Sequence, residues 1–135
     1  MILWKNAECL FGGVGDLSPQ RSDATTPRQL ICRLAEIEVY PEYLKEYLAF
    51  ANEVDRLSVE REPGVICLFP MQSVENPAQI RILEIYASEE AYQNHLKTDH
   101  FQKYKKGTMH MVKSLKLPTM QPLDVQTMKL IFKKE

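Results

Sequence analysis

The spacing of apolar residues changes several times along the chain, and the order of these changes restricts the fold more than any other feature. Within residues 30–39, Ala35, Ile37 and Val39 alternate with glutamates. Alternation with a period of two is typical of a strand that buries one face. We therefore expect a first strand over residues 30–39.

A helix is predicted directly after this strand. Pro41 and Glu42 suit a first helical turn, where the missing N–H of proline costs nothing and an acidic side chain meets the positive helix end. Glu62-Pro63-Gly64 ends the helix. Between these points, apolar side chains recur every three or four residues and form one stripe: Leu44, Tyr47, Leu48, Ala51, Val54 and Leu57.

Two further strands are expected to pair as a hairpin. Val65 to Met71 (VICLFPM) and Ile80 to Ala87 (IRILEIYA) are rich in apolar and β-branched residues, and Glu75-Asn76-Pro77 supplies a turn between them. Pro70 indicates an edge or a bulge, because proline cannot donate to the strand ladder.

The second helix is expected to be interrupted. Ser88 is a suitable cap for its start. The apolar pattern pauses near Thr98 and Asp99 and then resumes toward Val112. Asp99, with Gln102 three residues later, predicts a second cap at the pause.

A last strand is predicted from about Leu115. Pro118 and Pro122 interrupt it, and the apolar run Val125 to Phe132 is interpreted as its continuation. The resulting order, βαββαβ, is the ferredoxin-like α+β arrangement, an antiparallel sheet with both helices on one face.

The strand over residues 80–87 indicates that the other face of the sheet is covered too. Neither side of this strand is polar enough to face water freely. One side carries Ile80, Ile82, Glu84 and Tyr86, and the other carries Arg81, Leu83, Ile85 and Ala87. Since no second sheet is available within the chain, we expect a homodimer.

Composition and charge exclude several kinds of partner. Seventeen Lys and Arg against eighteen Asp and Glu leave a formal charge of −1, so neither nucleic acid nor an anionic membrane is strongly attracted. No apolar run approaches the length of a membrane span. Cys32 and Cys67 lie in apolar strands and are interpreted as core thiols, which favours a reduced compartment.

Residues 1–29 are expected to form a poorly ordered arm before a single domain over residues 30–135. The stretch from Gly12 to Pro27 is rich in Gly, Ser, Thr, Asp and Pro, which is typical of a segment that cannot repay the entropy of ordering. The arm also lacks the apolar core of a signal peptide. Together these features predict a cytoplasmic protein.

Three segments of the chain carry a family resemblance: Arg61 to Val65 with its Glu-Pro-Gly turn, Leu83 to Ala91 with Glu84-Ile85-Tyr86 before an acidic helix start, and His95-Leu96-Lys97-Thr98-Asp99-His100-Phe101. Over roughly residues 30–117 the chain resembles the antibiotic biosynthesis monooxygenase family. The resemblance implies a ferredoxin-like dimer whose two sheets close into a barrel, with a cavity between sheet and helices in each protomer. It also implies cofactor-independent oxygenation of phenols, anthrones or hydroquinones by O₂.

Such chemistry needs a base, an apolar pocket and hydrogen-bond donors for a developing oxyanion. His100 and His95 match the histidines of the family segment, and a neutral imidazole can take a phenolic proton near pH 7. His100 is the first choice as base. The alternatives are that His100 braces the helix break and that His95 is a core histidine paired with Asp99.

The pocket wall is expected to come largely from the strand that ends in Glu84 and Tyr86. Tyr86 is a candidate donor to an oxyanion, and Glu84 is a candidate partner for a histidine or a substrate hydroxyl. The alternative is a packed aromatic beside a buried ion pair between Glu84 and Arg33. We expect Ile82, Arg33 and Phe69 to complete the substrate-binding surface.

Metal and heme sites are not expected. Histidines five positions apart on a continuous helix diverge by about 140°, and no third ligand has a suitable spacing. The heme-degrading branch of the family carries Trp where this chain has Tyr86 and an iron-ligating His where it has Lys105, so the resemblance argues against heme.

The sequence therefore predicts a monooxygenase of the quinol type that acts on a small aromatic substrate without a cofactor. Two alternatives stay open. The first is a non-catalytic dimer that binds a small hydrophobic metabolite in the same cavity, and the second is an isomerase that acts on a small phosphorylated signalling metabolite.

Overall fold

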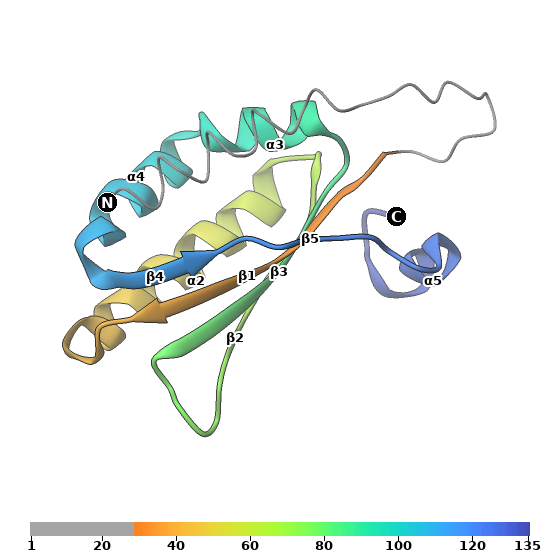
Figure 1. Cartoon of the computed structure of the whole chain (residues 1–135). Helices are drawn as coiled ribbons and strands as arrows, with labels where there is room; N and C mark the ends of the chain where they lie inside the picture. Colours follow the sequence, from red (N-terminus) through yellow and green to blue (C-terminus); the bar gives the residue numbers. More distant parts are fainter. Residues whose placement is uncertain (1–28) are drawn as a thin grey trace.

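The structure is a computed structural model that describes residues 29–135 (Figure 1). The predicted N-terminal arm thus lies outside the described residues, apart from Gln29. The elements are β1 (Ile31–Val39), η2 (Pro41–Tyr43), α2 (Leu44–Arg61), β2 (Val65–Gln72), β3 (Gln79–Tyr86), α3 (Glu89–Leu96), α4 (Asp99–Thr108), η3 (Met109–Met111), β4 (Val112–Lys116), β5 (Thr119–Met120) and α5 (Val125–Ile131).

The strands form one antiparallel sheet in the order β2-β3-β1-β4, and the short β5 also pairs with β1. Helices α2, α3 and α4 all lie on one face of this sheet (Figure 1). The predicted α+β ferredoxin-like fold is therefore confirmed. The hairpin of β2 and β3 is confirmed as well.

The core lies between the sheet and these helices, as the apolar stripe of α2 requires. Tyr47, Ala51 and Val54 of that stripe are buried against the strands. The side chain of Tyr47 is fully buried, and its hydroxyl lies 2.6 Å from that of Tyr104 on α4. This contact gives each of the two buried hydroxyls a hydrogen-bond partner.

The break between α3 and α4 falls where the sequence predicted it, but its cap is one residue earlier. Ser88 caps α3 by accepting from the N–H of Ala91. Thr98, not Asp99, caps α4, because its hydroxyl accepts from the N–H of Phe101 and donates to the carbonyl of His95. One threonine thereby closes the first helix and opens the second.

The prediction of a strand over residues 125–132 is wrong. Residues 125–131 form α5, which Asp124 caps by accepting from the N–H of Gln126 and from the hydroxyl of Thr127. The apolar spacing of Val125, Met128 and Phe132 also fits one helix face. An apolar run this short does not distinguish strand from helix, and the capping aspartate decides for the helix.

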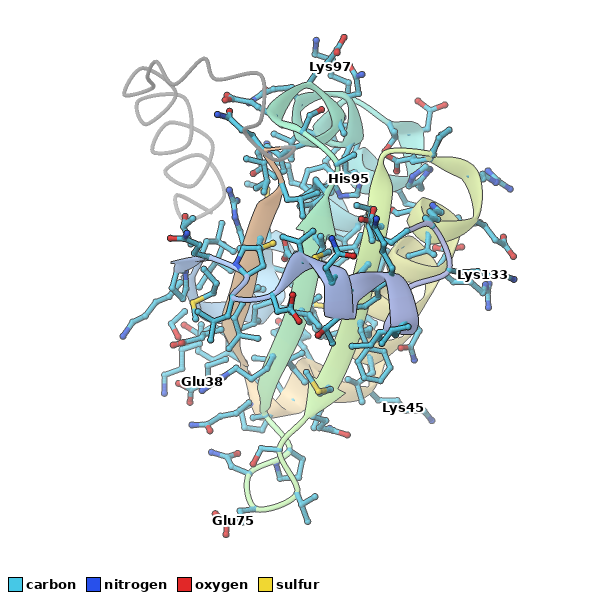
Figure 2. The ribbon with its side chains drawn as sticks, turned by 90° about the vertical axis from the view of Figure 1, so that its right-hand side faces the viewer. Glu38, Lys45, Glu75, His95, Lys97 and Lys133 are labelled. Carbon is cyan, nitrogen blue, oxygen red and sulfur yellow. The ribbon has the colours of Figure 1, made fainter. Side chains whose placement is uncertain are left out.

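Helix α5 lies across the strands on the face opposite α2, α3 and α4 (Figure 2). Its Met128 packs in a second buried cluster with Cys32, Ile66, Cys67 and Ile85. Cys32 and Cys67 are buried free thiols, as predicted. The chain therefore covers part of its outer sheet face itself, where the sequence had suggested that only a second copy would.

None of the helices between residues 29 and 135 has the length and apolar character needed to cross a membrane.

Candidate active site

A cavity lies between the helix-facing side of the sheet and the helices that cover it. The space open to the centre of a water molecule is about 40 Å³, enough for roughly three waters. The walls come from every main element of the core: Arg33, Ala35, Ile37, Val54, Asp55, Leu68, Ile82, Glu84, Tyr86, Tyr92, His95, Leu96, Phe101, Tyr104, Leu115 and Leu117. A one-ring ligand therefore needs some displacement of the half-buried leucines in this wall.

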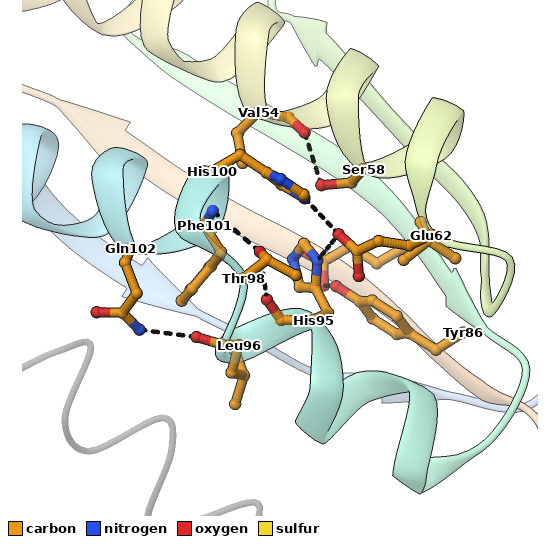
Figure 3. A network of polar contacts seen from close by, with 12 residues as sticks. Val54, Ser58, Glu62, Tyr86, His95, Leu96, Thr98, His100, Phe101 and Gln102 are labelled. Atoms are coloured by element: carbon orange, nitrogen blue, oxygen red, sulfur yellow. Dashed lines mark hydrogen bonds and ion pairs between the residues drawn. The ribbon is translucent and has the colours of Figure 1, made fainter.

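Glu62 joins the two predicted histidines at one side of the cavity (Figure 3). A single carboxylate oxygen, Oε2, lies 3.0 Å from Nδ1 of His95 and 2.5 Å from Nε2 of His100. Glu62 follows the last residue of α2, while the histidines lie on either side of the Thr98 cap. The helix break is what turns both imidazoles toward the same oxygen.

The contact with Glu62 selects one form of the His95 ring. Because a carboxylate only accepts, neutral His95 donates its proton from Nδ1, which leaves Nε2 with a free lone pair. Among residues 29–135, Nε2 of His95 has no hydrogen-bond partner. His95 is 3% exposed and lines the cavity. A buried basic nitrogen of this kind is suited to accept a proton from a ligand in the cavity.

The charge on Glu62 supports this role. Partial burial alone would raise the pKa of Glu62, but the hydrogen bonds from His95 and His100 outweigh burial and lower the pKa below its usual value. Glu62 is therefore ionised at neutral pH. An ionised carboxylate stabilises the imidazolium that forms when His95 accepts a proton.

Glu84, Tyr86 and Arg33 form a second polar region in the cavity wall. The sheet register places Arg33 opposite Glu84, and the Tyr86 hydroxyl donates to Oε1 of Glu84 at 3.0 Å. Burial raises the pKa of Glu84, and the charge of Arg33 partly offsets this rise. Burial and the neighbouring Glu84 also raise the pKa of Tyr86 well above its ordinary value, so Tyr86 is a neutral donor.

Most of the predicted site residues lie together. His95, Tyr86, Glu84, Ile82 and Arg33 all line the cavity.

Two predicted residues lie elsewhere. His100 belongs to the Glu62 network but is not part of the cavity wall. Phe69 pairs with Leu83 on the opposite side of the sheet and is 58% exposed. Of the two histidines, His95 is thus the one placed to meet a ligand.

Two carboxyls at this site, those of Glu62 and Asp55, were not predicted from the sequence. Glu62 was considered only as part of a turn that ends a helix, although its place in the family segment was a signal. Asp55 lies on the predicted apolar stripe of α2, four residues after Ala51. A polar residue on a stripe that otherwise faces the core is a usable signal for a buried group.

Glu62, His95 and His100 also have the chemistry to hold a metal ion. Their ligand atoms lie within 4.8 Å of one another, and two imidazoles with one carboxylate suit divalent transition metals. The sequence argument against a metal assumed a continuous helix, whereas the break between α3 and α4 brings the two rings together. The expectation of a metal-free site therefore needs its own experiment.

Comparison with known proteins agrees with the fold and the motifs. A family profile described as antibiotic biosynthesis monooxygenase matches residues 30–107. The chain belongs to this family. A search among curated proteins found no match.

Several solved structures resemble the chain in fold. One, from Bacteroides thetaiotaomicron and named as a candidate antibiotic biosynthesis monooxygenase, shares 44% identity with a TM-score of 0.70, over 71% of this chain and 91% of its own. Another, from Lactobacillus acidophilus and named as a candidate monooxygenase, shares 28% identity with a TM-score of 0.68. The match covers 71% of this chain but only 46% of that longer one.

A more distant relative shows how far the fold extends. A family member from Caulobacter crescentus shares 19% identity with a TM-score of 0.66, over 72% of this chain and 92% of its own. At this identity the likeness concerns the fold alone. The names of the nearer relatives support a monooxygenase, and the substrate has to be argued from the cavity.

Proposed function

We propose that the protein is a cofactor-independent monooxygenase that oxidises a small quinol-type aromatic substrate with O₂, with His95 as the general base. The observation that carries this proposal is the contact between Glu62 and Nδ1 of His95, which directs the free Nε2 of a cavity-lining imidazole to the ligand. His100 supports the base by donating to the same carboxylate oxygen.

The reaction balances without an external reductant. His95 removes a hydroxyl proton, and the electron-rich phenolate transfers an electron to O₂, after which the two radicals combine at a ring carbon. One oxygen atom stays on the ring as a hydroxyquinone oxygen, and the other leaves as water. The quinol itself supplies the electrons that reduce the second oxygen atom.

The apolar part of the cavity favours this chemistry. Ile82, Leu68 and Phe101 contribute hydrocarbon walls, which exclude water and strengthen the interaction of a substrate oxygen with nearby dipoles. Because the Tyr86 hydroxyl already donates to Glu84, its assistance to an oxyanion requires the ligand to compete with Glu84 for the proton. The proposal therefore gives Tyr86 an assisting role and His95 the central one.

An oxygen-electrode experiment tests the proposed function. We expect purified protein to consume O₂ with at least one of a panel of substituted hydroquinones, above the autoxidation measured with heat-denatured protein, and to yield one hydroxyquinone per O₂. Prior dialysis against EDTA should leave this rate unchanged.

Two other results are possible. Loss of uptake after EDTA, with recovery on adding Fe²⁺, would replace the metal-free mechanism with one that uses Glu62, His95 and His100 as ligands. No uptake with any substrate would contradict an oxygenase. In that case thermal stabilisation by the same compounds without turnover would identify a metabolite-binding protein.

We further infer that the protein forms a homodimer through the outer face of the sheet. Phe69 and Met71 of β2 and Met120 of β5 lie on this face and are 58%, 42% and 51% exposed. Apolar side chains gathered next to a covered cluster are typical of an interface. These residues are the described part of the surface best suited to meet a second copy.

The dimer is tested by sedimentation equilibrium. Phe69→Lys should weaken self-association at least tenfold, because it places a charge at the centre of the proposed interface. Val74→Lys is the matched control, since Val74 is 96% exposed in the turn between β2 and β3. A monomeric wild-type protein, or equal effects of both substitutions, would refute the interface.

A further inference from the structure

Asp55 is a buried carboxyl in the cavity wall, outside the Glu62 network. It comes from the middle of α2, is 6% exposed and lines the cavity. Its Oδ2 atom has no hydrogen-bond partner among residues 29–135. An unpartnered oxygen at this depth costs free energy, which a ligand group can recover by forming the missing hydrogen bond.

The groups around Asp55 decide what kind of partner it can accept. The charge of Glu84 on β3 repels an ionised Asp55 and so contributes to raising the pKa of Asp55, after burial. Arg33 on β1 lies opposite Glu84. The guanidinium carbon of Arg33 also lies 4.6 Å from the ring centroid of Tyr92. Among the described residues that line the cavity, Arg33 is the one Lys or Arg, and Glu84 lies opposite it.

The other titratable groups near Asp55 are weak acids of the core, His95, and the charged side chains of a second hollow that Asp55 also borders: Arg56, Glu60, Lys133 and Lys134. Burial raises the pKa values of Tyr47 on α2, Tyr104 on α4 and Cys67 on β2, and the charge of an ionised Asp55 adds to each rise. His95 on α3 lines the same cavity. Burial, with a further contribution from Glu84, raises the pKa of Asp55 to about 8. Asp55 is therefore mostly a neutral acid at pH 7, with one O–H to donate and oxygens to accept.

We propose that Asp55 is a specificity-determining residue that binds a second, uncharged oxygen of the substrate while His95 meets the first. This inference rests on the proposed function and assigns the residue that recognises the second oxygen of its quinol-type substrate. A neutral carboxyl can both donate to a carbonyl and accept from a hydroxyl. We expect the cavity to select against a ligand carboxylate, because its charge would meet Glu84, and Arg33 is the one Lys or Arg among the described residues of the cavity wall.

The geometry of the cavity is consistent with two separate polar contacts. His95 supplies one polar contact, and Asp55 supplies a second polar group in the same wall. Apolar side chains make up most of the remaining wall. An aromatic ring with oxygen on two of its positions satisfies both groups, whereas phenol satisfies only one.

Equilibrium binding without O₂ separates this inference from the question of turnover. The probes are hydroquinone, phenol and 4-hydroxybenzoate, titrated by calorimetry under argon into wild type, Asp55→Asn, Asp55→Leu and Glu53→Gln. Glu53 is on the same helix but pairs with Lys103 outside the cavity, so its substitution is the matched control.

We expect wild type and Glu53→Gln to bind hydroquinone about tenfold more tightly than phenol, the worth of one good hydrogen bond, and to bind 4-hydroxybenzoate most weakly. Asp55→Asn should keep most of the preference for hydroquinone, because the amide also donates and accepts. Asp55→Leu should reduce the preference to about one.

A second measurement does not depend on the folding of Asp55→Leu. In wild type the preference for hydroquinone should fall between pH 7 and pH 9 as Asp55 ionises, and in Asp55→Asn it should stay constant over that range. Both probes remain neutral there, since phenolic groups ionise near pH 10.

The inference is overturned by any of four results, whether or not the protein proves to be an oxygenase. These are an unchanged preference in folded Asp55→Leu, a preference in wild type that does not vary with pH, tightest binding of 4-hydroxybenzoate, and no binding of any probe by wild type. Binding with the expected preference but without O₂ uptake would support the inference and contradict the proposed function instead.

Discussion

Replacing His95 by alanine is expected to lower kcat for quinol oxidation by about 10²–10⁴-fold, the usual contribution of a general base. The substitution removes the nitrogen that accepts the substrate proton. KM should change much less, because the remaining cavity wall is kept. Steady-state O₂ uptake over a range of substrate concentrations measures both constants.

Glu62→Gln tests the same base through its partner. The amide can no longer stabilise an imidazolium by charge, and its NH₂ group can favour the wrong tautomer of His95. We expect kcat to fall by about 10-fold to 100-fold, the range seen when the group that orients a ligating or catalytic histidine is removed. The loss should be smaller than that of His95→Ala and should not add to it in the double variant.

Two matched control variants test whether the losses in kcat are specific to His95 and Glu62. His110 is an exposed histidine that packs edge-on against Tyr43, away from the cavity, and Glu60 is an exposed glutamate two positions before Glu62. His110→Ala and Glu60→Gln should leave kcat within about twofold of wild type. If His95→Ala also stayed in that range, the base would have to be sought elsewhere.

Asp55→Asn is expected to stabilise the protein at neutral pH and to flatten its stability between pH 4 and pH 8. The pKa of Asp55 is raised from 3.8 to about 8 by burial and by Glu84. A carboxyl whose pKa is raised on folding binds its proton more tightly in the folded state. Its contribution therefore favours folding most at low pH and is lost as the pH rises through this window.

The size of the effect follows from linkage. Each pH unit between the unfolded and folded pKa values changes the free energy of unfolding by up to about 1.4 kcal/mol. The wild-type protein should thus lose a few kcal/mol from this one group between pH 4 and pH 8, and the variant should not. At pH 4 the two proteins should have similar stability.

Urea unfolding at a series of pH values checks this prediction. Protein concentration is held constant, because self-association would add its own contribution to stability. The difference between wild type and variant isolates Asp55 from the other titrating groups. A difference that does not grow from pH 4 to pH 8 would contradict a protonated Asp55 in the folded protein.

The sequence was sufficient for those parts of the fold that depend on local patterns. The alternation in β1, the stripe on α2 and the Ser88 cap each specify their element from neighbouring residues alone. The prediction for residues 125–132 was wrong because no such unambiguous apolar pattern exists there. Residues 125–132 are too few to fix a period, and packing against Cys32 and Cys67 rewards an apolar side chain in either conformation.

Only part of the site could be predicted from the sequence, because the contacts of Glu62 with the two histidines join residues that are far apart in the chain. Glu62 is 33 positions from His95 and 38 from His100, and no local spacing relates them. The two histidines were found through the family segment. The different environments of the two histidines were not predicted, because they depend on the helix break at Thr98. This break places His95 in the cavity wall, whereas His100 contacts Glu62 outside that wall.

The position of Asp55 on the apolar stripe of α2 was a sequence signal for burial, but the stripe alone did not show how completely the carboxyl is buried. Only the strands beneath α2 and the helix α4 beside it exclude water from the carboxyl. Tertiary packing therefore determines which acids have shifted pKa values. Groups with shifted pKa values are candidates for a role in the chemistry.

The tail that follows α5 joins the two sides of the sheet. The ammonium of Lys134 donates to the backbone carbonyls of Glu62 and Val65, at 2.8 Å and 2.6 Å. These carbonyls flank the turn that carries the shared carboxylate, and α5 itself rests on the outer face. A partner that shifts α5 would therefore also shift the turn between Glu62 and Val65. Through the Glu62 carboxylate, binding on the outer face can then change the position of His95.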